Sequence, residues 1–440
     1  MQTHIVCNKR VHGAKKMNAK SFNRLPVFRL DKARNPSSHV CLLVLITFCA
    51  IVCLGSNAGL AQHSVPEFHK ILREKEAFDE TDLAALEQGE NVVRLLPVVD
   101  KREVAVCGLT SLQVPAEVFL QSFRESMAQK SNPAILEIGT FSGTPTLDDL
   151  RALTIENGDI EDLKECVVGD CQLKLSAMMI ERLHKEVDWE APDYRIQATH
   201  LLKLMLLDYV RDYLARGDVA LIEYNDKPKV VRLAEEQHAL KASSSYIYDV
   251  FNKFSQYVKG FPRLKAAIVE NAIVWSKVKF GLKPVIVINH ITIFKNEKEA
   301  GPQILIASKQ IYANHYFDSS LALTAFLNIP GANPGSYLFY ENRSRADGLE
   351  GAFSKIKRRI VEDRAVSSLK AILESSKANL NARALGRTES ESAPIQERSW
   401  RRWKVFGVHL FLWLFLITFV ALVALGNYGW KSAVSGTVHQ

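Results

Sequence analysis

The sequence predicts an α+β domain in which a curved antiparallel sheet packs on a long C-terminal helix, with a mainly helical insertion and a transmembrane helix near the C-terminus. Three observations lead to this fold class. Strand-like segments with short, turn-rich connections fill residues 281–342. One long amphipathic segment follows them at residues 349–380. Residues 405–425 then form an apolar run without Asp, Glu, Lys or Arg, which is long enough to cross a bilayer.

Residues 1–61 have the layout of an export signal. Nine Lys or Arg and one Asp precede the apolar run at residues 40–54, and a tail of small residues follows that a signal peptidase could cut after Ala61. Without cleavage, the run stays as a signal anchor. The leader holds most of the formal net charge of +8. Because no basic stripe or recognition motif follows it, nucleic acid is not expected as a partner.

The first part of the α+β domain, residues 62–144, contains both helical and strand patterns. Apolar residues with helical spacing open it, and strands with a two-residue apolar period follow. Pro115 suits the first position of the next helix, where its missing N–H would have no helical partner. The expected elements are a helix at 65–88, strands at 91–99 and 102–114, a helix from Pro115, and a strand at 134–141.

Residues 145–280 are expected to form a mainly helical insertion. Apolar patterns at 176–183 and 201–214 are helical, and the second is apolar nearly all round, which predicts a buried helix. Cys166 and Cys171 are close enough to close a small loop in an oxidising compartment, so we predict a disulfide between them. A metal site is not expected here, because further ligands at recognisable spacing are missing.

The second part of the α+β domain, residues 281–380, holds a run of strands and a closing helix. Short connections that contain Gly and Pro favour antiparallel pairing of these strands. The closing helix has one apolar face, which must cover another element. The expected strands are 285–294, 303–316, 321–327 and 337–342, and the expected helix is 349–380.

The remaining residues predict a membrane attachment. Residues 381–404 form a flexible linker, residues 405–426 the transmembrane helix and residues 427–440 a tail, with the lipid bilayer as a partner. A fully buried helix of a globular core is the alternative. Basic flanks usually stay on the cytoplasmic side, so the leader places the domain on the exported, periplasmic or extracellular, side. Four basic residues at 398–404 run against that orientation.

The order of these elements resembles the helix-grip fold of the START-like, or polyketide-cyclase-like, superfamily. The matching parts are residues 103–141 and 285–380, and the most family-like stretch is Val114-Pro115-Ala116-Glu117-Val118-Phe119. The large insertion at 145–280 departs from a compact member. The resemblance implies a hydrophobic cavity between sheet and helix, and binding of a lipid-like or aromatic small molecule. No cofactor is expected, because the sequence contains no cofactor motif.

Polar residues among the apolar strands are candidates for orienting such a ligand. Side chains of this kind fix the position of a molecule in a mainly apolar pocket. The alternative is that each of them packs in the core or faces solvent, with its hydrogen bonds satisfied. The candidates are His290, Tyr312, His315, Tyr316 and Tyr340.

A second candidate group lies between the last strand and the closing helix. Asn342, Arg343 and Arg345 could hold a carboxylate or phosphate through charge-assisted hydrogen bonds. In the alternative, Ser344 or Asp347 caps the closing helix and the arginines pair with neighbouring acids.

The sequence names no catalytic residue. It contains no Gly-x-Ser-x-Gly elbow, no phosphate loop ending in Gly-Lys-Ser or Gly-Lys-Thr, and no His-Glu-x-x-His. We therefore expect a membrane-tethered domain of the cell envelope that binds a hydrophobic ligand. The alternative is a non-catalytic structural or interaction protein with a filled core, whose protein partner the sequence does not identify. An enzyme becomes the better reading if Arg343, Arg345, His290 and His315 converge on one cleft.

Overall fold

The computed structural model describes residues 72–73, 78–128, 134–244, 252–264, 269–279, 283–296, 303–328, 335–351 and 354–384. All of them belong to one compact unit, Leu60–Gln440. The predicted leader, transmembrane helix and tail lie outside the described residues, as do residues 385–404 of the predicted linker. Residues 381–384, expected to open the flexible linker, are instead the end of helix α11 (Ser354–Ala384).

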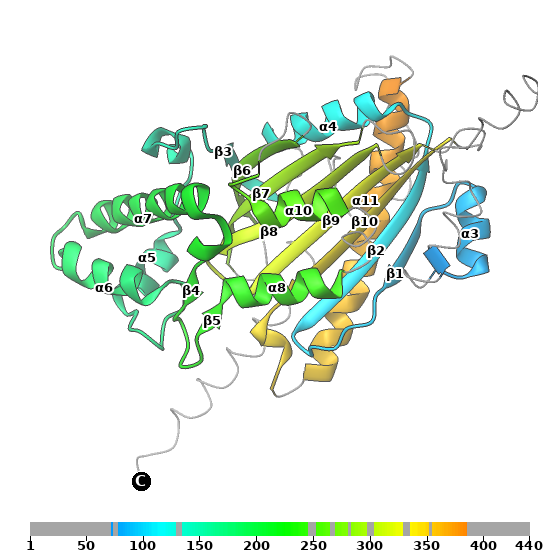
Figure 1. Cartoon of the computed structure of the whole chain (residues 1–440). Helices are drawn as coiled ribbons and strands as arrows, with labels where there is room; N and C mark the ends of the chain where they lie inside the picture. The colour runs from blue at the N-terminus through cyan, green and yellow to red at the C-terminus, as the bar shows by residue number, and fades with distance from the viewer. Residues whose placement is uncertain are drawn as a thin grey trace, which may run out of the picture. The chain divides into compact units, whose positions relative to one another are not determined.

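The fold is α+β and is built on an eight-stranded antiparallel sheet (Figure 1). One part of the predicted fold class needs correction, because none of the helices in the described part of the chain is long and apolar enough to cross a membrane. The physical basis of that prediction, the apolar run at 405–425, falls outside these residues.

The sheet joins the two predicted parts of the domain, because β2 pairs with β10 along its full length. In spatial order the strands are β1 (Val92–Leu95), β2 (Glu103–Leu112), β10 (Ser336–Arg345), β9 (Ser319–Asn328), β8 (Ile304–Ala313), β7 (Val285–Lys295), β6 (Val269–Val278) and β3 (Ile135–Thr140). Strand β6 lies inside the segment expected to be mainly helical, so the insertion ends earlier than predicted.

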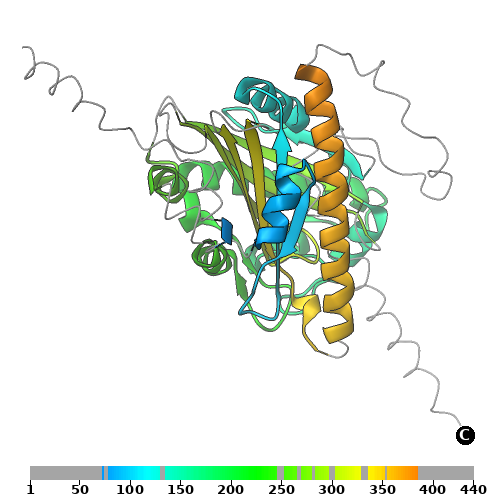
Figure 2. The same ribbon diagram turned by 90° about the vertical axis from the view of Figure 1, so that its right-hand side faces the viewer.

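Helices α4 (Ala116–Ala128) and α11 (Ser354–Ala384) cover one face of this sheet. Figure 2 shows α11 running along the edge formed by β1 and β2. Strand β2 and helix α11 approach each other closely there. A Cβ atom at Gly108 of β2 would lie 2.7 Å from Leu373 Cδ1 and 2.9 Å from Leu369 Cδ2 of α11. The expected wrapping of the whole sheet around this helix is therefore corrected to packing mainly on the edge strands.

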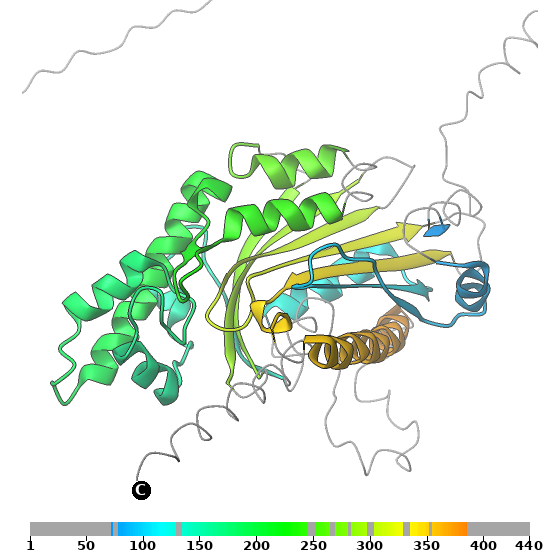
Figure 3. The ribbon, with the colours of Figure 1, turned by 90° about the horizontal axis from the view of Figure 1, so that it is seen from below.

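The other face is covered by α7 (Tyr194–Arg216), α8 (Leu233–Ser243) and α10 (Asn252–Gly260). In Figure 3, α8 and α10 lie on the opposite side of the sheet from α11. The short elements η1 (Leu147–Leu150), α5 (Asn157–Lys164) and α6 (Ala177–Glu186) share a hydrophobic cluster with α7 and strands β6 to β8. The insertion therefore extends the layer on this face. The remaining described elements are α3 (Glu80–Glu87), η2 (Gly217–Ala220), the hairpin β4 (Glu223–Tyr224) and β5 (Val231–Arg232), and η3 (Asp347–Leu349).

We call the face under α4 and α11 the inner face, and the face under α7, α8 and α10 the outer face. On β2, Val104 belongs to the hydrophobic cluster of Leu369 on α11, whereas the next residue, Ala105, belongs to that of Leu240 and Phe254. Successive side chains of a strand point to opposite faces. The register therefore assigns every side chain of the central strands to one face.

Candidate ligand-binding face

Neutral polar side chains form a patch on the inner face, in the middle of the sheet. Cross-strand pairing places them there: Asn289 pairs with Gln310, and Thr324 pairs with Tyr340, whose own neighbour on β2 is Gly108. Paired residues of an antiparallel sheet share a face. We call the set the inner polar patch, and it consists of Ser276, Asn289, Ser308, Gln310, Ser320, Thr324, Tyr340, Asn342 and Ser344.

In the half of the patch on β9 and β10, the polar side chains form hydrogen bonds with one another. Ser320 Oγ and Ser344 Oγ are 2.8 Å apart, Ser344 Oγ donates to Asn342 Oδ1 at 2.8 Å, and Asn342 Nδ2 donates to Ser320 Oγ at 3.3 Å. Burial raises the pKa of Tyr340 above its usual range, although a hydrogen bond with Asn342 opposes this, so the phenol is neutral. These residues hold one another in place.

The half of the patch on β6 to β8 is not satisfied. Gln310 is only 1% exposed, and within the described residues neither its Nε2 nor its Oε1 has a hydrogen-bond partner. The hydroxyl of Ser276 is buried without a partner in the same way. A buried polar group left unpaired costs about 1–3 kcal/mol. Gln310 therefore offers two donors and an acceptor to a group that none of the described residues provides.

The main chain around Gln310 is fixed from the outer side. Gln237 of α8 is fully buried, and its Nε2 donates to the carbonyl oxygens of Gln310 and Ser320, 2.9 Å each. A β-bulge follows at Ile311, because Asn289 pairs with Gln310 while Ile288 pairs with Tyr312. The backbone is thus held by α8 while the Gln310 side chain faces the inner side.

Charged side chains of the same strands lie on the outer face. Glu103 of β2, 1% exposed, accepts from Arg343 Nη1 at 2.8 Å and from Arg345 Nη2 at 2.9 Å. Arg343 Nε also donates to Glu341 at 2.6 Å, and Arg345 Nη1 donates to Glu236 of α8 at 3.0 Å. Each arginine is paired with acids of the protein, which is the alternative that the sequence left open for Arg343 and Arg345.

His290 is also on the outer face, where it is buried among polar partners. Its Nδ1 lies 2.7 Å from Tyr213 Oη and its Nε2 lies 2.9 Å from Asn271 Oδ1. Burial lowers the pKa of His290 well below its usual range, and the neighbouring Lys309 adds to the effect, so the imidazole is neutral. Burial, helped by Lys241, also lowers the pKa of Lys309 to about 8, while Asp218, with which both lysines form ion pairs, opposes the shift.

His315 and Tyr316 lie in the connection between β8 and β9. His315 Nε2 is 3.1 Å from Asp159 Oδ1, and its Nδ1 is 3.2 Å from the carbonyl oxygen of Gln172. Tyr316 has a positive φ of 63°, and its hydroxyl accepts from the backbone N–H of Lys283 at 3.2 Å. His315 thus helps to anchor the insertion to the end of the sheet, whereas Tyr316 holds the segment that leads into β7.

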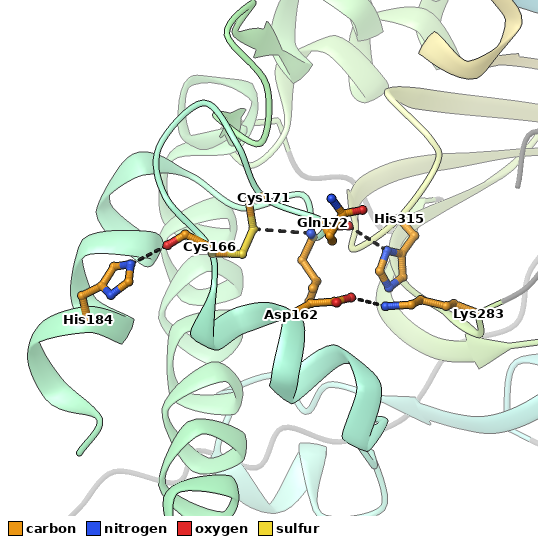
Figure 4. Close-up of a disulfide and its surroundings, with 8 residues drawn as sticks. Asp162, Cys166, Cys171, Gln172, His184, Lys283 and His315 are labelled. Atoms are coloured by element: carbon orange, nitrogen blue, oxygen red, sulfur yellow. Dashed lines mark hydrogen bonds and ion pairs between the residues drawn. A yellow bond between two sulfur atoms is a disulfide. The ribbon is translucent and has the colours of Figure 1, made fainter. Parts of the chain in front are cut away.

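A disulfide joins Cys166 and Cys171 next to this anchor (Figure 4). The backbone N–H of Cys171 donates to Asp226 O at 2.9 Å, and His184 Nε2 contacts the carbonyl oxygen of Cys166. Across the described residues, no group of three or more His, Cys, Asp or Glu could hold a metal ion.

The predicted site residues therefore separate into two sets. Tyr340 and Asn342 belong to the inner polar patch, whereas the others lie on the outer face or in the connection after β8. His290 on β7 and Arg343 on β10 are separated by two strands, which is about 14 Å. They do not form a common cleft with His315. Tyr312, for its part, packs between Tyr209 and Tyr224, and burial raises the pKa of its phenol above the usual range.

Sequence reasoning missed Gln310, Asn289 and Ser308. The alternation in β8 contains the signal, since Ile304, Ile306, Ser308 and Gln310 fall on one side of the strand and Leu305, Ala307 and Lys309 on the other. Two neutral polar residues interrupt an apolar face there. The candidates chosen from the sequence were mostly His, Tyr and Arg, so these neutral polar residues were not among them.

Comparison with known proteins adds no relative. No protein-family model matches the chain, and neither a curated protein nor a solved structure is similar enough to it to count as a match. The resemblance to the START-like superfamily therefore stays a prediction from element order.

Proposed function

We propose that this domain binds a small molecule between the inner face of the sheet and helices α4 and α11, with the inner polar patch holding the polar group of the ligand. The observation that carries the proposal is the buried amide of Gln310, which has no hydrogen-bond partner in the described part of the chain. Buried polar groups in native proteins nearly always have a partner, and an exception calls for a specific explanation. A bound molecule provides one.

The surroundings of the patch suit a ligand with an apolar body. The inner face next to it is lined by Ile291, Ile306 and Val287, all nearly fully buried. Pockets for small molecules combine such an apolar lining with a few polar groups that set orientation. We therefore still propose a hydrophobic ligand, as the sequence led us to expect. Its polar group is held by Gln310 and not by Arg343 and Arg345.

The Cys166–Cys171 disulfide supports the predicted location of the domain on the exported side. Disulfides persist in oxidising compartments and are rare in the cytosol.

The alternative function, a structural protein with a filled core, is favoured by one contact. Phe119 of α4 stacks on Phe326 of β9 with ring centroids 5.1 Å apart, so one end of the inner face is closed by side chains. Such packing over the whole face would leave no room for a ligand.

Solvent extraction of the purified full chain, followed by mass spectrometry, separates the two functions. We expect a small molecule in the extract of the wild-type protein and its loss from Gln310→Leu, whose side chain offers no hydrogen bond. Tyr312→Phe is the matched control, because it removes a buried hydroxyl that also has no partner among the described residues but lies on the outer face. Equal extracts from all three proteins, or none from any, would refute ligand binding at the patch.

A further inference from the structure

The position of the charged residues in the sheet limits the chemistry of the ligand. On strands β2 and β6 to β10, the inner face of the described chain carries two charged side chains, Glu270 and Lys295. Both lie at the rim, where β6 begins and β7 ends, and their side chains are 38% and 42% exposed. They pair with each other at 2.9 Å, and Arg124 of α4 also holds Glu270. The charges at the rim are thus already compensated.

The helices that face the patch contribute no charge either. The buried residues of α11 are apolar except for Ser376, whose hydroxyl donates to the carbonyl oxygen of Ile372 at 2.7 Å. On α4 the buried polar residue is Ser126, which donates to the carbonyl oxygen of Phe123 at 2.6 Å. Neither helix presents a cation or an anion to the inner polar patch.

Alternation places the buried charges of the same strands on the outer face. Lys309 adjoins Gln310 in sequence but points away from it, toward Asp218. Glu341 and Arg343 flank Asn342 and pair with each other on the outer side. The sheet therefore separates a neutral inner face from an ionic outer face.

We infer that the ligand is uncharged and that its polar group both donates and accepts hydrogen bonds, as an amide or an alcohol does. This inference rests on the proposed function. An ionised group buried without a counter-charge is strongly disfavoured, and the patch has none to offer. An amide side chain such as Gln310 presents donors and an acceptor together, so a second amide or a hydroxyl complements it. Fatty-acid carboxylates and phospholipid headgroups do not.

A set of probes with one chain length and different polar groups tests the inference. The full chain is titrated at neutral pH with decanamide, 1-decanol, decanoate and decylammonium, and binding is followed by calorimetry. We expect decanamide and 1-decanol to bind about a hundredfold more tightly, or more, than either ion, because burial of an uncompensated charge is so unfavourable. Gln310→Leu should weaken binding of the neutral probes, while Tyr312→Phe should leave it unchanged.

The outcomes distinguish this inference from the proposed function. If decanoate or decylammonium binds as tightly as decanamide, and Gln310→Leu weakens that binding, the site exists but the ligand is charged, and the inference is overturned. If no probe distinguishes the wild-type protein from Gln310→Leu and Ser308→Ala, the proposed function itself is wrong. Because both variants retain or improve apolar burial, loss of folding does not obscure the result.

Discussion

Two buried glutamines should respond to the same substitution in opposite directions. Gln310→Leu removes an amide that has no partner among the described residues, so the folded state no longer includes the penalty of an unpaired polar group. That penalty is about 1–3 kcal/mol, and the free energy of unfolding of the ligand-free protein should rise by this amount. A substitution that abolishes binding would thus stabilise the fold.

Gln237→Leu provides the comparison at the same residue type. Gln237 Nε2 donates to the carbonyl oxygens of Gln310 and Ser320, and its loss leaves both buried carbonyls without that donor. The substitution also removes Gln237 Oε1, which has no partner among the described residues, so one of the two penalties is offset. We expect a decrease of about 1–3 kcal/mol in the free energy of unfolding. The two variants should therefore differ by several kcal/mol although both convert a buried glutamine to leucine.

Urea unfolding followed by tryptophan fluorescence measures the difference. The ligand must first be removed, because a molecule that binds only the folded state at a hundred times its Kd adds about 2.7 kcal/mol to the wild-type value. The midpoint should move to higher urea for Gln310→Leu and to lower urea for Gln237→Leu, with an unchanged slope. A destabilised Gln310→Leu would refute the reasoning, since it would mean that the Gln310 amide is satisfied in the unliganded fold.

Three further predictions concern the outer face and the insertion. Glu103→Gln should lower the free energy of unfolding by about 3–5 kcal/mol in urea unfolding, since Arg343 and Arg345 lose the charge that compensates them. Glu362→Gln is the control, because the part-exposed carboxylate of Glu362 on α11 pairs with Arg358 outside this cluster. Burial raises the pKa of Asp159, but His315 and Lys283 lower it below its ordinary value of 3.8 overall. The stability that Asp159 contributes is therefore present above the pKa of the unfolded state and is lost as the pH falls through the pKa of the folded state. Asp159→Asn should then flatten the decline in the free energy of unfolding below about pH 4. An unchanged decline would contradict this. Replacing Cys166 and Cys171 by serine should cost about 2 kcal/mol in the same assay, because the closed loop is short; equal stability with and without reductant would show that the bond does not form in solution.

The strands of the second half of the domain were predictable because short runs rich in β-branched residues are bounded by turn segments that contain Gly and Pro. The segments expected at 285–294, 321–327 and 337–342 fall on β7, β9 and β10, and the closing helix expected at 349–380 falls on α11. Each of these elements is long for its type and is bounded by residues that favour turns, which is the signal that sequence patterns give most clearly.

Strand β6 was missed for a physical reason. Its apolar residues Ile273, Val274 and Trp275 are consecutive and are buried on both faces of the sheet. A short continuous apolar run of this kind cannot be distinguished from a buried helical segment by its period. The insertion was therefore expected to extend to residue 280.

The site could be predicted only in part, because the face of each side chain depends on register. Arg343 and Arg345 were identified as a polar cluster, but their partner Glu103 lies 240 residues from Arg343 in sequence. Tyr312 changed sides relative to simple alternation because of the bulge at Ile311. The alternation in β8 groups Gln310 with Ile306 and Ser308, but which face of the sheet they share is fixed only by the pairing of β7 with β8.

An experimental structure of the full chain purified from its natural source tests the central claim most directly. We predict density for a bound molecule within hydrogen-bond distance of Gln310 Nε2 and Oε1, with an apolar body extending toward α4 and α11. The absence of such density, or a single ordered water that completes the hydrogen bonds of the amide, would contradict the claim.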